Sequence, residues 1–173
     1  MHPLPEYPRP SMRRDSYVNL NGLWDYAITQ SSEFPAKWDG AILVPYSPEA
    51  KASGVGRTLQ PGQWLHYHRT FTPPAGEGGR VLLHFGAVDY ACAVEVNGRL
   101  AGGHRGGYWP FTLDITDLLR PQGRNTLWVA VQDPTGTGAG PGQADPPARR
   151  DVLPGPERHL ADGLAGAGAG KLH

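Results

Sequence analysis

The chain has 173 residues, enough for one domain with a substantial hydrophobic core. Its 16 Lys and Arg balance 16 Asp and Glu, so a formal net charge of zero argues against a basic nucleic-acid surface and an acidic tail. No apolar run approaches the roughly 18 residues of a membrane span, and the single cysteine, Cys92, excludes an intrachain disulfide framework and a cysteine-rich zinc site.

The expected elements are short strands. Gly (24) and Pro (18) make up about a quarter of the chain, which disfavours a mainly helical fold. Apolar and polar residues alternate along several segments, as in half-buried strands. The expected strands are residues 20–28, 41–44, 64–71, 81–85, 90–96 and 126–131. After the fifth of them, Asn97-Gly98 predicts a tight hairpin, because a primed turn needs positive φ. Such a series indicates an all-β fold, a sandwich or jelly roll.

The composition changes after residue 133. All five Trp, seven Tyr and four Phe lie at or before Trp128. Residues 134–173 are rich in Gly, Pro and Ala, so they can bury little area and we expect a disordered tail. The predicted domain therefore spans residues 1–133, with its core from about residue 6.

Three residue types could carry chemistry within the strands. His66 and His68 share one face of an expected strand, as metal ligands can. No carboxylate follows at a matching spacing, so we expect two structural histidines and no metal site. Asp89 has no second carboxylate at a fixed spacing, and we expect it to hold a loop rather than to act in catalysis. Cys92 lies on an alternating strand, which favours a buried, inert thiol.

The segment from His104 to Phe111 is the candidate for ligand binding. Tyr108 and Trp109 could stack on the apolar face of a sugar ring. The alternative, which we favour, is a structural loop whose aromatic residues pack on the core. Trp128 is expected in the core or at a domain interface, on the face opposite the core valines of its strand.

Several sequence blocks occur in a characteristic order. They begin with Tyr7-Pro8-Arg9-Pro10 and Arg14, continue with Leu20-Asn21-Gly22-Leu23-Trp24, and run through residues 44–49, 83–90, 96–98 and 104–111 to residue 134. In this order they resemble the N-terminal sugar-binding domain of family 2 glycoside hydrolases, which include β-galactosidases, β-glucuronidases and β-mannosidases. The resemblance extends over residues 6–142. Its motif positions are Asn21, Gly22, Trp24, Asp89, Asn97, Gly98, His104, Gly106, Gly107, Pro110 and Phe111.

The resemblance implies a jelly-roll, galactose-binding-like β-sandwich. In the family, an immunoglobulin-like domain and a (β/α)₈ barrel follow it, and both catalytic glutamates lie on the barrel. It therefore implies no catalytic residue and no cofactor for this chain. The expected function is that of a non-catalytic N-terminal domain of an enzyme that hydrolyses β-glycosidic bonds in carbohydrate metabolism. The alternative is a free-standing carbohydrate-binding module.

Neither function needs a nucleic-acid or membrane partner. Residues 1–5 show no basic end followed by an apolar stretch, so no signal peptide is expected. Together with the single cysteine, this predicts a cytoplasmic protein.

The closing strand of the family is absent from residues 134–173 as written. Codons can be chosen that encode residues 158–172 in the written frame and a different peptide when the reading frame is shifted by one base. That peptide contains Gly-Ile-Trp-Gln-Thr-Val-Trp-Leu-Glu-Pro-Val, which resembles the closing strand. We therefore expect a shift of reading frame near residues 138–143 and a truncated product; the alternative is an ordinary Gly/Ala-rich tail. Without its closing strand the sheet would keep an unpaired edge, which favours aggregation.

Overall fold

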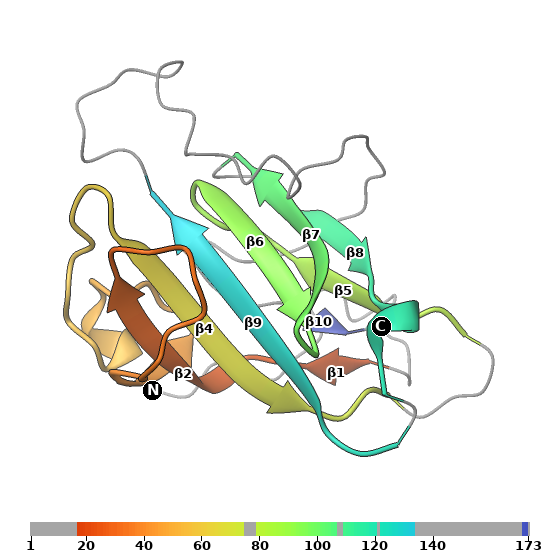
Figure 1. Ribbon diagram of the computed structural model, residues 1–173. Helices are drawn as coiled ribbons and strands as arrows, with labels where there is room; N and C mark the ends of the chain where they lie inside the picture. The colour runs from red at the N-terminus through yellow and green to blue at the C-terminus, as the bar shows by residue number, and fades with distance from the viewer. Residues whose placement is uncertain (1–16, 75–78, 107–108, 121, 134–170, 173) are drawn as a thin grey trace.

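The computed structural model describes residues 17–74, 79–106, 109–120, 122–133 and 171–172. Its strands are β1 (Val18–Asn19), β2 (Gly22–Thr29), β3 (Gly40–Val44), β4 (Trp64–Phe71), β5 (Leu82–Phe85), β6 (Ala91–Val96), β7 (Arg99–Arg105), β8 (Phe111–Asp114), β9 (Asn125–Gln132) and β10 (Lys171–Leu172). They form two antiparallel sheets, of order β3-β2-β4-β9-β6-β7 and β1-β10-β5-β8 (Figure 1). Two 3₁₀ turns, Lys51–Ser53 and Thr116–Leu118, complete the regular structure of the described residues. None of their helical segments is long and apolar enough to cross a membrane.

The core lies between the two sheets. Alternate residues of β4 and β9 point inward, and Leu65, Tyr67, Leu127 and Val129 are almost fully buried. Leu83 of β5 meets them from the four-stranded sheet, with no exposed surface. The alternation that predicted the strands is therefore the alternation that fills the core. The predicted all-β sandwich is confirmed, and β4 has the predicted bounds.

The Leu-Asn-Gly-Leu-Trp block carries the chain from one sheet to the other. Trp24 donates its indole N–H to the carbonyl of Leu20 (2.8 Å), and Arg69 donates to the same carbonyl through Nη1 (2.6 Å). Gly22 has φ of +129°, and a Cβ there would lie 3.3 Å from Arg69 Nη1. The glycine is required because the turn has positive φ and because the guanidinium approaches it closely. The predicted strand over residues 20–28 is thus broken at Leu20–Asn21.

Asn97 and Gly98 form the predicted hairpin between β6 and β7. Their φ angles are +54° and +75°, as a primed turn requires. Asn97 Nδ2 also donates to the carbonyl of Leu118 (2.8 Å) and to Asn125 Oδ1 (2.7 Å), while its Oδ1 accepts from the Thr126 N–H (3.0 Å). This side chain therefore joins the hairpin to the beginning of β9.

β8 was not among the predicted strands, and β7 was predicted only as the second arm of the hairpin, without bounds. β7 lacks apolar alternation, and the pairing with β6 holds it in place with a register shift between Val94 and Glu95. Gly102 of β7 has φ of +153°, and a Cβ there would lie 2.8 Å from Leu113 Cδ2 of β8. The two sheets approach each other closely at this point, and only a glycine fits without displacement of Leu113.

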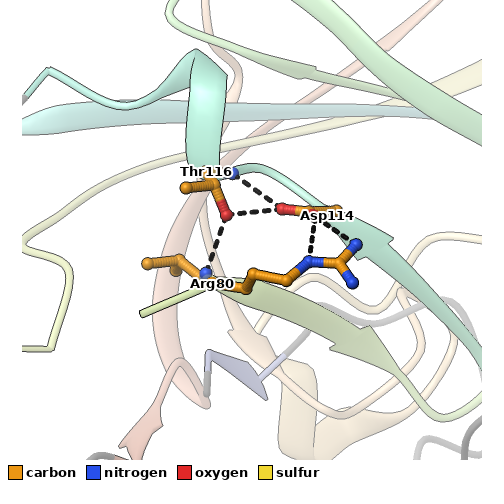
Figure 2. Close-up of polar contacts among 4 residues, drawn as sticks. Arg80, Asp114 and Thr116 are labelled. Carbon is orange, nitrogen blue, oxygen red and sulfur yellow. Dashed lines mark hydrogen bonds and ion pairs between the residues drawn. The ribbon is translucent and has the colours of Figure 1, made fainter. Parts of the chain in front are cut away.

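Asp114, the last residue of β8, is the centre of a polar network (Figure 2). Its Oδ1 accepts from Thr116 N–H (3.0 Å) and Thr116 Oγ1 (2.5 Å), and its Oδ2 accepts from Arg80 Nε (2.7 Å). The Thr116 hydroxyl in turn accepts from the Val81 N–H (2.9 Å). The hydrogen bonds from Thr116, and then those from Arg80, lower the pKa of Asp114. These hydrogen bonds connect the residues just before β5 to the end of β8.

Two residues of the segment predicted to be disordered form a strand. Lys171 and Leu172 make β10, which lies between β1 and β5 and pairs antiparallel with both. Sequence reasoning did not anticipate this strand, because a pair of residues has no detectable alternation. The rest of the tail, and with it the predicted shift of reading frame, lies outside the described residues.

Candidate carbohydrate-binding site

Three strand ends meet at one end of the six-stranded sheet, where β6 begins and where β7 and β9 end. Ala91 of β6 pairs with Arg105 of β7 on one side and with Gln132 of β9 on the other. The N–H of Gly106 donates to the carbonyl of Tyr90 (2.7 Å), and the Tyr90 N–H donates to the carbonyl of Gln132 (3.3 Å). The residues that flank these strand ends therefore lie close together. We call four of them the rim: Asp89, Tyr90, Trp109 and Asp133.

Two aromatic side chains of the rim are exposed. Trp109 is 74% exposed and Tyr90 40%. A Cβ on Gly106 would lie 3.8 Å from Trp109 Cδ1, which places the indole beside the β7 end. An exposed ring can stack on the apolar face of a pyranose. Sugar contact by Trp109 remains a prediction, and Tyr108 and Gly107 lie outside the described residues.

Phe111 belongs to the core, and the partly buried His104 connects it to the strand ends beside Gly106. The His104 ring stacks on Phe111 (4.5 Å between centroids, 13° between planes), which stacks on Phe85 (4.6 Å, 9°). His104 Nε2 is buried and has no hydrogen-bond partner among the described residues. Burial lowers the pKa of His104, and a hydrogen bond with the Gly106 backbone opposes this effect. The structural role that we favoured for this segment stays a prediction, with His104 stacked on Phe111 and Trp109 exposed.

Asp89 and Asp133 give the rim its charge. Burial raises the pKa of Asp89, and the charge of Asp133 raises it further. Each carboxylate oxygen can accept hydrogen bonds from hydroxyl groups. Carboxylates beside exposed aromatic rings are the kind of surface that binds a sugar through both its hydroxyls and its apolar face.

His66 is a structural residue on the outer face of the six-stranded sheet. Its Nε2 lies 2.8 Å from Thr29 Oγ1 and 3.0 Å from the Ser31 carbonyl, and its ring stacks on Trp128 at 5.7 Å. Burial lowers the pKa of His66, which favours the neutral ring. The Phe34 ring covers Trp128, with 5.5 Å between the ring centroids. Trp128, which we considered for a domain interface, is therefore covered by a residue of this chain.

His68 has a different environment from His66. Its Nδ1 lies 3.0 Å from Asp25 Oδ2, and its ring stacks on Trp38 at 5.2 Å. The two histidines share the predicted face but contact different partners. No group of three potential metal ligands occurs among the described residues. Cys92 is buried, and burial raises the pKa of its thiol to about 12, as expected of an inert side chain.

Sequence reasoning missed Tyr90 and Asp133 as rim residues. The Asn97-Gly98 hairpin would have paired Tyr90 with its partner on β7 by simple counting, but the register shift between Val94 and Glu95 moves that pairing by one residue. The only sequence signal at Asp133 is that it follows an alternating segment, and this signal does not predict a site residue.

Comparisons with known proteins identify the family to which this fold belongs. A sequence model of the family "Glycosyl hydrolase 2 galactose-binding domain-like" matches residues 55–156. The β-glucuronidase of Canis lupus familiaris is 31% identical over 131 residues, which cover 66% of this chain and 20% of that protein. The β-glucuronidase of Paenibacillus borealis is 34% identical over 135 residues, which cover 73% of this chain and 22% of that protein.

Solved structures show the same relationship. The structure of Bifidobacterium dentium β-glucuronidase complexed with coumarin-3-O-glucuronide matches with a TM-score of 0.54 and 30% identity, over 69% of this chain and 21% of that one. The chain thus spans about a fifth of the length of these relatives. The fold, the ordered motifs and the family match agree, and the chain belongs to the glycosyl hydrolase 2 family as a galactose-binding-like N-terminal domain.

Proposed function

We propose that this chain is the non-catalytic N-terminal module of an enzyme that hydrolyses β-linked glycosides, and that it braces the substrate-binding region of that enzyme. The observation that carries the proposal is the match of a galactose-binding-like domain to about a fifth of each β-glucuronidase. The partners would be the immunoglobulin-like domain and the barrel that follow this domain in the family. We place the module in the cytoplasm, since a chain with one cysteine needs no oxidising compartment.

The module alone should not hydrolyse glycosides. Glycoside hydrolysis needs two carboxyl groups that face each other across the scissile bond. The family resemblance assigns both to the barrel, and it assigns none to this chain. Purified chain should leave 4-nitrophenyl β-D-glucuronide and β-D-galactoside uncleaved. Turnover that co-elutes with the chain through two orthogonal columns would contradict the proposal.

A second candidate function is carbohydrate binding by the module itself. The exposure of Trp109 beside Gly106, at the strand ends that Asp89 and Tyr90 flank, favours it. Binding of a β-galactoside or β-glucuronide should be saturable in calorimetry at millimolar sugar, and Trp109→Ala should abolish it. Phe34→Ala is the matched control, because Phe34 is also exposed (56%) but lies on the outer sheet face. Equal loss in both variants, or no heat with the native chain, would count against a site at the rim.

A further inference from the structure

Two Asn-Gly pairs occur in the chain, Asn21-Gly22 and Asn97-Gly98. Asn-Gly is the dipeptide most prone to deamidation, because glycine has no Cβ and leaves its backbone nitrogen open to attack the preceding side-chain amide. During the reaction the amide gives up its nitrogen as ammonia. A pair whose amide is engaged in hydrogen bonds should therefore react more slowly than a pair whose amide is not.

The side-chain amide of Asn97 is engaged on both sides. Its Nδ2 donates to the carbonyl of Leu118 (2.8 Å) and to Asn125 Oδ1 (2.7 Å). Its Oδ1 accepts from the N–H of Thr126 (3.0 Å). Because ammonia leaves with Nδ2, both bonds of that nitrogen must break when the Gly98 nitrogen replaces it. The folded state therefore protects Asn97 from deamidation.

The side-chain amide of Asn21 lacks this protection. Its Oδ1 is buried and has no hydrogen-bond partner in the part of the chain that the structure describes. The hydrogen bonds of Asn21 hold its backbone instead: its N–H donates to Asn19 Oδ1 (2.8 Å), and its carbonyl accepts from Arg69 Nη1 (3.2 Å). Asn21 and Gly22 are each partly exposed as whole residues, so water reaches the pair.

Arg69 places its charge on the backbone of the same pair. Its Nη1 also donates to the Leu20 carbonyl (2.6 Å), and its guanidinium lies over the Trp24 ring, 5.8 Å from the ring centroid. These contacts fix the guanidinium beside the peptide bond from Asn21 to Gly22. A cation on a peptide carbonyl stabilises negative charge on the adjoining nitrogen, and so makes its N–H more acidic. That nitrogen belongs to Gly22 and is the attacking group in deamidation.

We propose that Asn21 is a site of self-modification, at which the folded chain converts asparagine to isoaspartate with the assistance of Arg69. The Gly22 nitrogen loses its proton to water and attacks Asn21 Cγ. The bond from Cγ to Nδ2 breaks, and Nδ2 takes up a proton and leaves as ammonia. The product is a succinimide, in which the Gly22 nitrogen is bonded to both carbonyl carbons of Asn21.

Water then opens the succinimide at the carbonyl that Arg69 contacts. The water oxygen bonds to the main-chain carbon of Asn21, and the bond from this carbon to the Gly22 nitrogen breaks. One water proton passes to that nitrogen and the other to solvent, and the chain continues through Cγ as isoaspartate. Among the residues described, no carboxylate forms an ion pair with Arg69. The new carboxylate would supply that partner, which favours isoaspartate over the aspartate that opening at Cγ would give.

The modification would lie where the chain passes from one sheet to the other. Asn21 follows β1 of the four-stranded sheet and precedes β2 of the six-stranded sheet (Figure 1). Isoaspartate adds a methylene group to the main chain, next to the Leu20 carbonyl that Trp24 and Arg69 share. Conversion should therefore loosen the connection between the sheets as the protein ages.

The test is incubation of the folded full chain in mildly alkaline buffer, followed over time by tryptic peptide mapping with mass spectrometry. Trypsin places the two pairs in separate peptides, residues 15–37 and 81–99. Conversion at Asn21 should be at least about tenfold faster than at Asn97, whose amide must first leave its partners. In urea-unfolded chain the two rates should become similar. Equal rates in the folded chain, a faster rate at Asn97, or no conversion at Asn21 would overturn the proposal.

The ratio of isoaspartate to aspartate tests the role of Arg69, and electron-transfer fragmentation distinguishes the two products. The ratio at Asn21 should be higher in the folded native chain than in the unfolded chain or in Arg69→Met, and Arg69→Lys should restore part of it. Because this ratio is set when the ring opens, a merely loosened turn would not change it. Equal ratios in all four samples would overturn the assistance by Arg69.

Asn125→Ala is the matched variant for the protected pair. It removes one acceptor from Asn97 Nδ2, so conversion at Asn97 should become faster while conversion at Asn21 stays unchanged. An unchanged rate at Asn97 would contradict protection by its hydrogen bonds. None of these readouts depends on sugar binding or on glycoside hydrolysis.

Discussion

Gly102→Ala should destabilise the domain more than a glycine substitution elsewhere. The added Cβ would lie 2.8 Å from Leu113 Cδ2, and the residue would keep a φ of +153° that side chains rarely adopt. Strained backbone costs about 1–3 kcal/mol and overpacking about 1–3 kcal/mol. Because Leu113 is only partly buried, its methyl end can turn away, so we expect a total of about 2–4 kcal/mol.

Equilibrium urea unfolding, followed by Trp fluorescence, measures this loss. Gly56→Ala is the matched control, since Gly56 has φ of +64° but nothing within 4 Å of its Cβ position; it should cost about 1–2 kcal/mol. In the double variant Gly102→Ala/Leu113→Ala the clash is absent, so the loss should be smaller than the sum of the two single losses. A loss for Gly102→Ala no larger than for Gly56→Ala would refute the close approach of β7 to β8.

Three further outcomes are expected from the polar contacts. Because the pKa of Asp114 is lowered in the folded state, its contribution to the free energy of unfolding should be present above the unfolded pKa of about 4 and lost as the pH falls through the folded pKa. Asp114→Asn should flatten this part of the profile of stability against pH. An unchanged profile would contradict the network around Asp114. The pKa of His104 is also lowered, by burial, so stability should fall as the pH drops below about 6.5, and His104→Phe should reduce that fall in the same unfolding measurements. Asn97→Ala removes four side-chain hydrogen bonds, the longest of them from Thr126 Oγ1 (3.5 Å), and should cost about 2–4 kcal/mol by urea unfolding. A loss under about 0.5 kcal/mol would show that the network contributes little.

The strands with strong alternation could be predicted from the sequence. β4 and β9 alternate because one face of each lies against the core, and their bounds were predicted to within one residue. The hairpin at Asn97-Gly98 predicted that a strand follows, but the extent of β7 could not be predicted, since Gly102 and Gly103 give it no apolar pattern and its conformation depends on pairing with β6. β1 and β10 are too short to carry any period, and only the sheet makes them strands.

The candidate site was predictable only in part. The segment from His104 to Phe111 was recognised, but its division into core and surface was not, because residues 106–110 follow no regular period. His104 and Phe111 are brought together by stacking across β7 and β8, whereas Trp109 between them remains exposed. Tyr90 lies at the rim because it directly precedes β6, and a register shift that the local sequence does not reveal places Gly106 rather than Arg105 opposite it.

Sequencing of the coding DNA from Gln132 onward tests most directly whether this domain belongs to a longer β-glycosidase. The account predicts one base gained or lost near residues 138–143, after which the frame continues into an immunoglobulin-like domain and a barrel with two catalytic glutamates. If the written frame stands and no sequence of this family follows, the module is a separate small sandwich. The proposal of an N-terminal enzyme domain would then be contradicted, and sugar binding at the rim would become the function to pursue.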